Sequence, residues 1–211
     1  SGSAYGKSTL YFCDLLNPNY WRTSTNYFYI RPDDGDEITF ISSILSTLTI
    51  GKTNTISKIY TESASTSLWQ LSQPFSFIGC VAPYSAQSTP MGIFYLGRYG
   101  IYKFDGQNSQ LISDVATDDI KDINQANLGN VASIYYKNEY RMAYTSQSTG
   151  AGYNDRTLIY DVIRDSYIKD IETTNCWAIF NSADDFGGLY SGSSATDSKI
   201  YAHSSQPNNF L

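Results

Sequence analysis

The chain repeats a two-residue unit in which a branched aliphatic residue precedes a tyrosine. Two copies, Ile134-Tyr135 and Leu189-Tyr190, lie close to others, and five recur at long intervals, as Leu10-Tyr11, Ile59-Tyr60, Ile101-Tyr102, Ile159-Tyr160 and Ile200-Tyr201. The successive tyrosines of these five copies are 49, 42, 58 and 41 residues apart. A period of this size is typical of repeat proteins whose unit is a small four-stranded antiparallel sheet.

A large apolar residue follows each of the five widely spaced copies of the dipeptide at a similar distance. These followers are Trp21, Trp69, Leu111, Tyr167 and Phe210. Five copies with matched followers favour a true structural repeat over a chance recurrence of a common dipeptide.

The composition favours strands over helices. Aromatic residues make up 15% of the 211 residues, with 19 tyrosines, and charged residues make up only 16%. Aromatic and β-branched side chains suit a pleated surface, so we expect an all-β protein. A chain of this length buries roughly 70% of its unfolded surface and needs no disulfides to hold a core.

The charge of the chain argues against a nucleic-acid partner. Its formal net charge is −6, with a sequence pI near 4.6, and its 14 basic residues are scattered singly. Nucleic-acid binding depends on clustered lysine and arginine that neutralise phosphates. The longest apolar runs have the length of a strand, so we expect no membrane insertion and a soluble protein. Residues 1–3, Ser-Gly-Ser, resemble a cloning remnant.

Hairpins are predicted at four places with the same layout. The clearest is residues 91–106, MGIFYLGRYGIYKFDG, where two apolar runs flank a glycine-bounded turn. The other three pair residues 48–52 with 57–61, 140–145 with 157–162, and 187–191 with 199–203.

A further strand is expected before each hairpin and another after most of them. The preceding runs, 38–44, 77–85, 131–136 and 176–181, carry small residues that suit innermost strands. The following runs are 67–71, 109–113 and 166–171. Four antiparallel strands per unit, laid radially, predict a β-propeller of about five blades, with residues 4–211 as a single propeller domain.

The ends of the chain leave the number of blades open. Residues 9–14 resemble the third strand of a unit, and the chain also finishes on a third strand. Either the N-terminal piece completes the last blade and closes the ring, which would protect its edge strands, or the chain is a fragment of a longer propeller. A short helix is expected within residues 114–127.

The sequence predicts no enzyme, and we assign no catalytic, cofactor-binding or metal-binding residue. His203 is the only histidine, and no nucleophile elbow or zinc-binding helix motif occurs. The three cysteines, Cys13, Cys80 and Cys176, lie far apart in the sequence and are interpreted as small buried residues. One disulfide between two of them is the alternative. The acidic run 31–37 is interpreted as a turn, with a calcium loop as the alternative.

Two other functions remain as alternatives. A five-bladed glycoside hydrolase needs a pair of carboxylates about 5 to 10 Å apart. The predicted innermost strands contain no Asp or Glu, although acidic residues flank them at Asp36, Glu37, Glu139, Asp184 and Asp185. A glycan-binding propeller is the other alternative, because tyrosine rings stack against sugar faces, although tyrosines at recurring strand positions also serve to pack blades together.

Several segments together resemble the propeller modules of structural proteins in tailed-phage virions. They are TLYFCDLLNPNYW (9–21), DGDEITFISSI (34–44), FIGCVAPYSAQ (77–87), GIFYLGRYGIYKFDG (92–106) and ISDVATDDIKDI (112–123). The resemblance covers about residues 9–171. It implies a tail, tail-hub or head-to-tail connector component of the virion that works by shape, with other virion proteins or a host-surface glycan as partners. No catalytic residue carries over, because the matching positions are turn formers and core residues.

Overall fold

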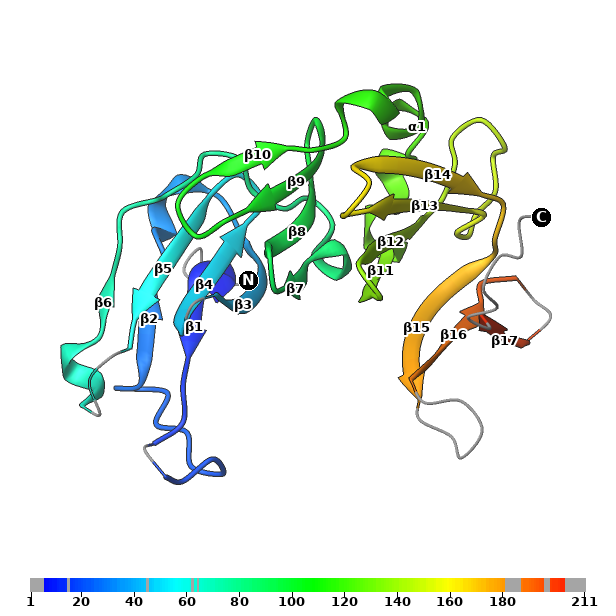
Figure 1. The fold of residues 1–211 in the computed structure, drawn as a ribbon. Helices are drawn as coiled ribbons and strands as arrows, with labels where there is room; N and C mark the ends of the chain where they lie inside the picture. Colours follow the sequence, from blue (N-terminus) through cyan, green and yellow to red (C-terminus); the bar gives the residue numbers. More distant parts are fainter. Residues whose placement is uncertain are drawn as a thin grey trace. The chain divides into compact units, whose positions relative to one another are not determined.

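The computed structural model describes residues 6–14, 16–44, 46–61, 63, 65–180, 187–195 and 198–203. Within these residues the protein has 17 strands in five antiparallel sheets and one short α-helix, α1 (Thr117–Lys121) (Figure 1). The prediction of an all-β protein is confirmed. The described part of the chain contains no helix with the length and apolar character needed to cross a bilayer.

The chain divides into two compact units, each of which is described here by itself. The first comprises residues 1–83 and 88–111, and the second comprises residues 84–87 and 112–211. The described residues also include six short 3-10 helices, one before β1 and the others between strands, at Gly6–Ser8, Pro32–Asp34, Thr66–Leu68, Pro83–Ser85, Asp114–Ala116 and Gln125–Asn130.

The first unit holds three sheets. One has two strands, β1 (Thr9–Tyr11) and β2 (Tyr27–Tyr29). The next has four, β3 (Ile38–Ile44), β4 (Thr47–Lys52), β5 (Ile56–Tyr60) and β6 (Gln70–Leu71). The last also has four, β7 (Gln87–Thr89), β8 (Gly92–Gly97), β9 (Gly100–Phe104) and β10 (Ser109–Leu111).

The second unit holds two sheets. The first contains β11 (Ala132–Tyr136), β12 (Glu139–Tyr144), β13 (Arg156–Asp161) and β14 (Ser166–Asp170). The second contains β15 (Thr174–Phe180), β16 (Gly188–Ser193) and β17 (Ile200–His203). Strands that follow one another in the chain lie next to each other in all these sheets, so each is a meander.

The five widely spaced copies of the dipeptide mark a corresponding strand in each sheet, whereas Ile134-Tyr135 lies in β11 and Leu189-Tyr190 lies in β16. Four copies lie in β5, β9, β13 and β17, which are the third strands of their sheets in chain order. The first copy lies in β1, whose partner β2 corresponds to a fourth strand. The prediction of repeated antiparallel units is therefore confirmed at the level of strand order.

The followers of the dipeptide have a structural role in two of the repeats. Leu111 pairs directly with Tyr102, and Tyr167 pairs with Tyr160 and stacks on its ring at 4.8 Å between centroids. Trp69 immediately precedes β6. Trp21 does not pair with the tyrosine that it follows, because the residue opposite Tyr11 is Tyr27. Phe210 lies outside the described residues.

All four hairpins form where they were predicted, as β4–β5, β8–β9, β12–β13 and β16–β17. Three of the four preceding strands also form, as β3, β11 and β15. The outer strands form as β6, β10 and β14, and the first of these is only two residues long because a 3-10 helix occupies Thr66–Leu68. The short helix predicted within 114–127 forms as α1, between two 3-10 helices.

The strand predicted over residues 77–85 is wrong. The Ser76 hydroxyl bonds to the backbone of Ile78, which turns the chain, and Pro83 starts a 3-10 helix. Gly79 instead packs closely against the backbone of the β4–β5 turn. A Cβ added at Gly79 would lie 2.2 Å from the Lys52 carbonyl oxygen. The first strand of that sheet is β7, which begins only at Gln87.

The interpretation of all three cysteines as buried is also wrong. Cys80 is buried, Cys13 is half-buried and Cys176 is exposed, and all three are free thiols. Cys176 lies on β15, where five of the seven residues are exposed.

The core explains why the central strands are so apolar. Ile30, Ile50 and Ile59 form a fully buried cluster in the first unit, and side chains from β1, β2, β3 and β6 pack around it. Every residue of β8 is buried, including Phe94 and Tyr95. Full burial on both faces means that β8 is covered on both sides of its sheet.

Candidate functional site

An open groove in the first unit is lined mainly by apolar side chains. We call it the aromatic groove, and it encloses about 500 Å³. Its lining residues are Leu10, Tyr11, Phe12, Cys13, Trp21, Ile41, Leu48, Thr61 and Trp69. They come from β1, β3, β4 and the ends of β5 and β6, so the groove forms where the two-stranded sheet meets the four-stranded one.

Rings that pack on one another build the wall of the aromatic groove. Trp69 packs against Phe12, at 5.2 Å between ring centroids, and against Phe28, at 6.4 Å and nearly parallel, and the two phenylalanine rings also contact each other at 5.6 Å. The indole N–H of Trp69 donates to the Ser63 carbonyl at 2.8 Å, which fixes the orientation of the ring. This wall is therefore preorganised by contacts within the protein.

Trp21 forms the exposed rim of the groove. Its indole N–H donates to the Pro18 carbonyl at 3.0 Å, yet 53% of the residue remains accessible to solvent. A large ring held in place but left open to water is a feature of binding surfaces. The lining residues include no carboxylate, histidine or lysine, and Tyr11 and Cys13 are the titratable side chains among them.

The acidic run 31–37 forms the predicted turn, and a lysine occupies its interior. Lys52 donates from Nζ to the Ile30 and Arg31 carbonyls at 3.0 and 3.1 Å and to Asp34 Oδ1 at 2.6 Å. Burial alone would raise the pKa of the Asp34 carboxyl, but the hydrogen bond from Lys52, aided by the Asp36 N–H, lowers it below the ordinary value. The positive charge beside the Asp34 carboxylate is therefore that of Lys52, in the place where a calcium loop would have a calcium ion.

Asp36 ties the same turn to the neighbouring hairpin. Its two carboxylate oxygens accept from the backbone N–H of Asn54 at 2.9 Å and from the Asn54 side chain at 3.2 Å. Its backbone carbonyl accepts from the Ser8 hydroxyl at 2.6 Å. These bonds give Asp36 a structural role between three segments of the first unit.

His203 lies in a chain of polar contacts that the sequence did not predict. Its Nε2 is 2.8 Å from the Ser191 hydroxyl, and its Nδ1 is 3.3 Å from Glu172 Oε1. The order serine, histidine, carboxylate is that of a hydrolytic triad. Ser191 is only 2% exposed, however, so its hydroxyl is closed to a substrate carbonyl and the contacts serve to join β16, β17 and the segment before β15. The paired hairpin strands were a signal that could have placed Ser191 and His203 together.

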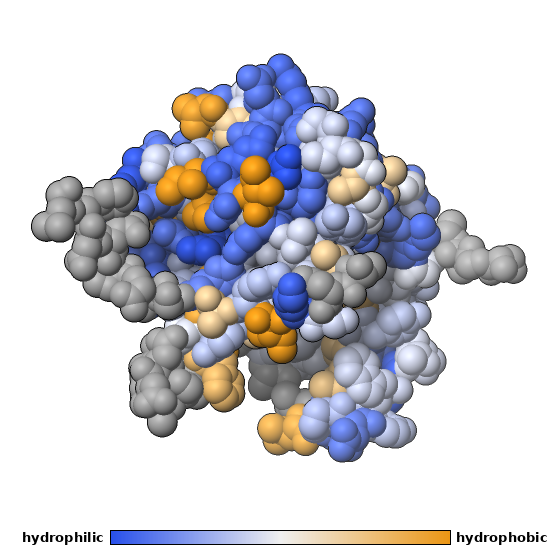
Figure 2. All heavy atoms as spheres, turned by 90° about the vertical axis from the view of Figure 1, so that its right-hand side faces the viewer, coloured by the Kyte–Doolittle hydropathy of each residue, from blue (hydrophilic) through white to orange (hydrophobic). Residues whose placement is uncertain are grey.

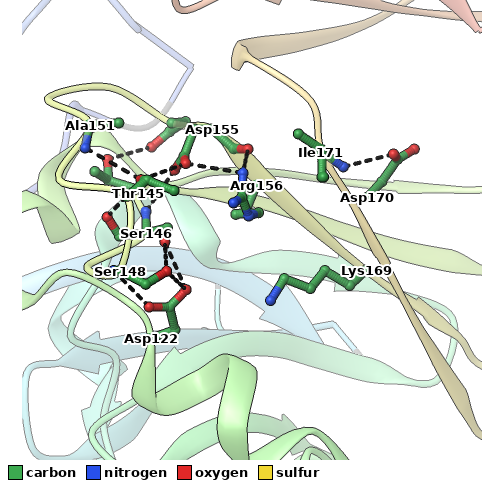
Figure 3. Close-up of polar contacts among 12 residues, drawn as sticks. Asp122, Thr145, Ser146, Ser148, Ala151, Asp155, Arg156, Lys169, Asp170 and Ile171 are labelled. Carbon is green, nitrogen blue, oxygen red and sulfur yellow. Dashed lines mark hydrogen bonds and ion pairs between the residues drawn. The ribbon is translucent and has the colours of Figure 1, made fainter.

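A polar network in the second unit holds the long loop between β12 and β13 (Figure 3). Asp122 accepts from the hydroxyls of Ser146 and Ser148 at 2.7 and 3.0 Å and from the Ser148 N–H at 2.8 Å. Asp155 accepts from the Ser146 N–H and from the Thr149 hydroxyl at 2.8 and 2.7 Å. Both carboxylates accept hydrogen bonds from residues 146–149, and these bonds hold the loop in place.

The remaining acidic residues considered for glycoside hydrolysis have partners of their own. Glu37 pairs with Lys7 at 2.8 Å, and Glu139 pairs with Arg141 at 2.7 Å. Asp184 and Asp185 lie outside the described residues. The described Asp and Glu residues include no pair that we assign as acid and nucleophile, and among the described residues no group of three metal-ligating side chains comes together.

The second unit exposes several large apolar side chains. Examples are Ile163, Ile168, Ile171 and Ile200. In the face shown in Figure 2, hydrophobic residues form separate groups among hydrophilic ones. Isolated exposed apolar residues are ordinary on a protein surface, so we assign no binding patch to them.

Comparison with known proteins adds no relative: no family model matches the chain, and no curated protein matches it.

Proposed function

We propose that the protein is a non-enzymatic binding module with a β-propeller scaffold, and that it works as a component of a tailed-phage particle. The phage setting rests on the sequence segments that resemble virion propeller modules. The aromatic groove is the single observation that carries the binding role.

Contacts between neighbouring sheets within each unit support a radial arrangement. In the first unit, Phe40 of β3 meets Tyr95 of β8 at 6.1 Å between ring centroids, and the Ser88 hydroxyl of β7 donates to the Ser43 carbonyl of β3 at 3.1 Å. In the second unit, β11 lies beside β15. Early strands of successive sheets converge in a propeller, where they line the axis.

The aromatic groove fits an apolar segment of another protein. Its lining is dominated by aliphatic and aromatic side chains, and Tyr11 and Trp21 at its edge are half exposed. Tyrosine and tryptophan are enriched at the energetic centres of protein interfaces, because each buries a large area with few rotatable bonds. Assembly through this groove would cover rings that are open in the isolated chain.

Thiol labelling tests this proposal with a control inside the chain. Cys13 lines the groove, whereas Cys176 is exposed on β15. We expect a bulky maleimide to label both thiols in the isolated protein, and we expect Cys13 to become protected in purified particles of the phage that encodes the chain. Protection of Cys13 should be lost when Trp21→Ala weakens the contact, while the labelling of Cys176 stays the same.

Two results would contradict the proposal. Absence of the chain from purified particles, measured by mass spectrometry, would remove the virion setting. Full labelling of Cys13 in particles that contain the chain would show that the groove stays open, and the groove would then have no role in assembly.

A further inference from the structure

A second cleft in the first unit shares no lining residue with the aromatic groove. It encloses about 290 Å³ between three loops. The β4–β5 turn contributes Thr53 and Asn54, the segment 77–79 contributes Phe77, Ile78 and Gly79, and the β8–β9 turn contributes Arg98 and Tyr99. We call it the Arg98 cleft.

The base of the Arg98 cleft is rigid. The Cys80 N–H donates to the Lys52 carbonyl at 2.9 Å, and the backbone N–H of Asn54 donates to Asp36 at 2.9 Å. Gly79 is packed so closely on the β4–β5 turn that a Cβ would overlap the backbone. A ligand would therefore meet preformed loops, and little ordering would be needed on binding.

Two residues that line this cleft have hydrogen-bond donors with capacity to spare. Arg98 Nη2 is 3.4 Å from Asn54 Oδ1, which is its closest recorded partner, and no carboxylate in the described part of the chain pairs with the guanidinium. Gly79 is buried, and its N–H donates to no acceptor among the described residues. A buried N–H without an acceptor is uncommon and is usually satisfied by a ligand or water.

Two aromatic rings flank these donors and are almost entirely open to solvent. Phe77 is 76% exposed and Tyr99 is 74% exposed. Rings of this kind at the mouth of a cleft offer flat apolar faces to a ligand. The Arg98 cleft therefore combines a cation, a free backbone donor and two stacking surfaces.

We infer that the Arg98 cleft binds a sugar that carries a carboxylate, such as a uronic acid residue of a glycan. The planar guanidinium of Arg98 matches a carboxylate in a two-point contact. The aromatic rings match the apolar face of a pyranose, and the volume accommodates one or two sugar units. A longer polyanion is disfavoured by the net charge of −6.

Calorimetric titration with glucuronic acid, glucose and acetate tests each part of the inference. We expect glucuronate to bind with a Kd on the order of 1 mM, a typical weak affinity for a single small ligand. Glucose lacks the carboxylate and acetate lacks the ring, so each should bind at least about tenfold more weakly. Equal binding of acetate would exclude the sugar, and equal binding of glucose would exclude the carboxylate contact.

Three variants locate the site. Arg98→Gln should weaken glucuronate binding at least about tenfold, and Tyr99→Ala should weaken both glucuronate and glucose. Arg164→Gln removes an exposed arginine of the second unit and should change nothing. Unchanged binding in Arg98→Gln, or no glucuronate binding to the intact protein at about 20 mM, would overturn the inference. The aromatic groove is not involved, so this result is independent of the proposed role in assembly.

Discussion

The Nζ atom of Lys52 lies 2.6 Å from Oδ1 of Asp34, and the side chain of Lys52 is only 1% exposed. The Ile30 and Arg31 carbonyls accept the remaining donors of this ammonium group. A buried cation is tolerated only when its charge and its donors are all satisfied. Lys52 therefore fixes the path of the chain from β2 to β3, and with it one side of the unit that holds both candidate sites.

Replacing Lys52 by methionine should destabilise the first unit. The variant leaves two carbonyls and a partly buried carboxylate without their donor, so we expect the free energy of unfolding to fall by about 3 kcal/mol. Urea unfolding monitored by tryptophan fluorescence measures the change. Lys7→Met is the matched control, because Lys7 and Glu37 form an exposed pair, and it should leave the transition where it is. Equal effects of the two changes would contradict the role of Lys52.

The same pair predicts a dependence of stability on acid. The folded protein lowers the pKa of Asp34 below 3.8, so the ionised form stabilises the fold above that pH. This contribution is lost as the pH falls through the folded pKa. The difference in unfolding free energy between the wild type and Asp34→Asn should therefore be largest near neutral pH and shrink below pH 3.8. A constant difference across this range would contradict the prediction.

The repeated dipeptide predicted the order of the strands well, because each widely spaced copy marks a strand even though the repeats differ in length. Tyr102 and Tyr160 mark third strands wherever the connections between sheets are longer or shorter. The failure at 77–85 has a local cause, since the bonds of the Ser76 hydroxyl and the close approach of Gly79 to Lys52 override the strand preference of Phe77 and Ile78. Alternation of apolar residues carries no information about such backbone contacts.

Gly79 gives a direct test of that close approach. An alanine Cβ would lie 2.2 Å from the Lys52 carbonyl oxygen and 2.6 Å from the Asn54 nitrogen, both of them backbone atoms. The turn would have to move, so Gly79→Ala should cost about 2 kcal/mol of stability. Gly129→Ala is the control, because nothing lies within 4 Å of its added Cβ. Chemical denaturation of both variants measures the difference in stability, and equal denaturation midpoints would refute the predicted clash.

The candidate sites were less predictable than the fold. Trp21 and Trp69 stood out as followers of the repeat, but their convergence on one groove depends on the pairing of Tyr11 with Tyr27 across a long connection. Arg98 and Tyr99 occupy an ordinary hairpin turn in the sequence. Their importance appears only when the 77–79 segment is seen to lie against the same turn.

The Asp122 network makes a prediction about loop dynamics. Asp122→Asn keeps the shape of the side chain but removes its charge and one of its acceptors, so the bonds to Ser146 and Ser148 should weaken. We expect faster amide exchange at residues 146–148 and a loss of about 1–2 kcal/mol of stability. Asp118→Asn, at an exposed position of α1, should leave both quantities unchanged. Unaltered exchange in Asp122→Asn would show that the loop is held by other contacts.

The contacts of His203 predict a pH dependence with a defined sign. Burial lowers the pKa of His203 below 6.5, and the nearby charge of Arg141 adds to the effect, while Asp170 opposes it. The unfolded chain therefore takes up the proton first, and stability is lost as the pH falls through 6.5 toward the folded pKa. Glu172 works in the opposite direction, because burial, followed by the charge of Asp170, raises its pKa above 4.5.

Removing the titration of Glu172 isolates the contribution of the histidine. We compare Glu172→Gln with the double variant that also carries His203→Gln, by urea unfolding at about pH 7.5 and about pH 5.5. The single variant should lose stability on acidification, whereas the double variant should lose measurably less. Equal losses of stability in the two variants would mean that His203 has the same pKa in the folded protein and in the unfolded chain. Because His203 contacts Ser191 on the neighbouring strand, that outcome would also argue against a hydrogen bond that holds β17 to β16 through the neutral imidazole.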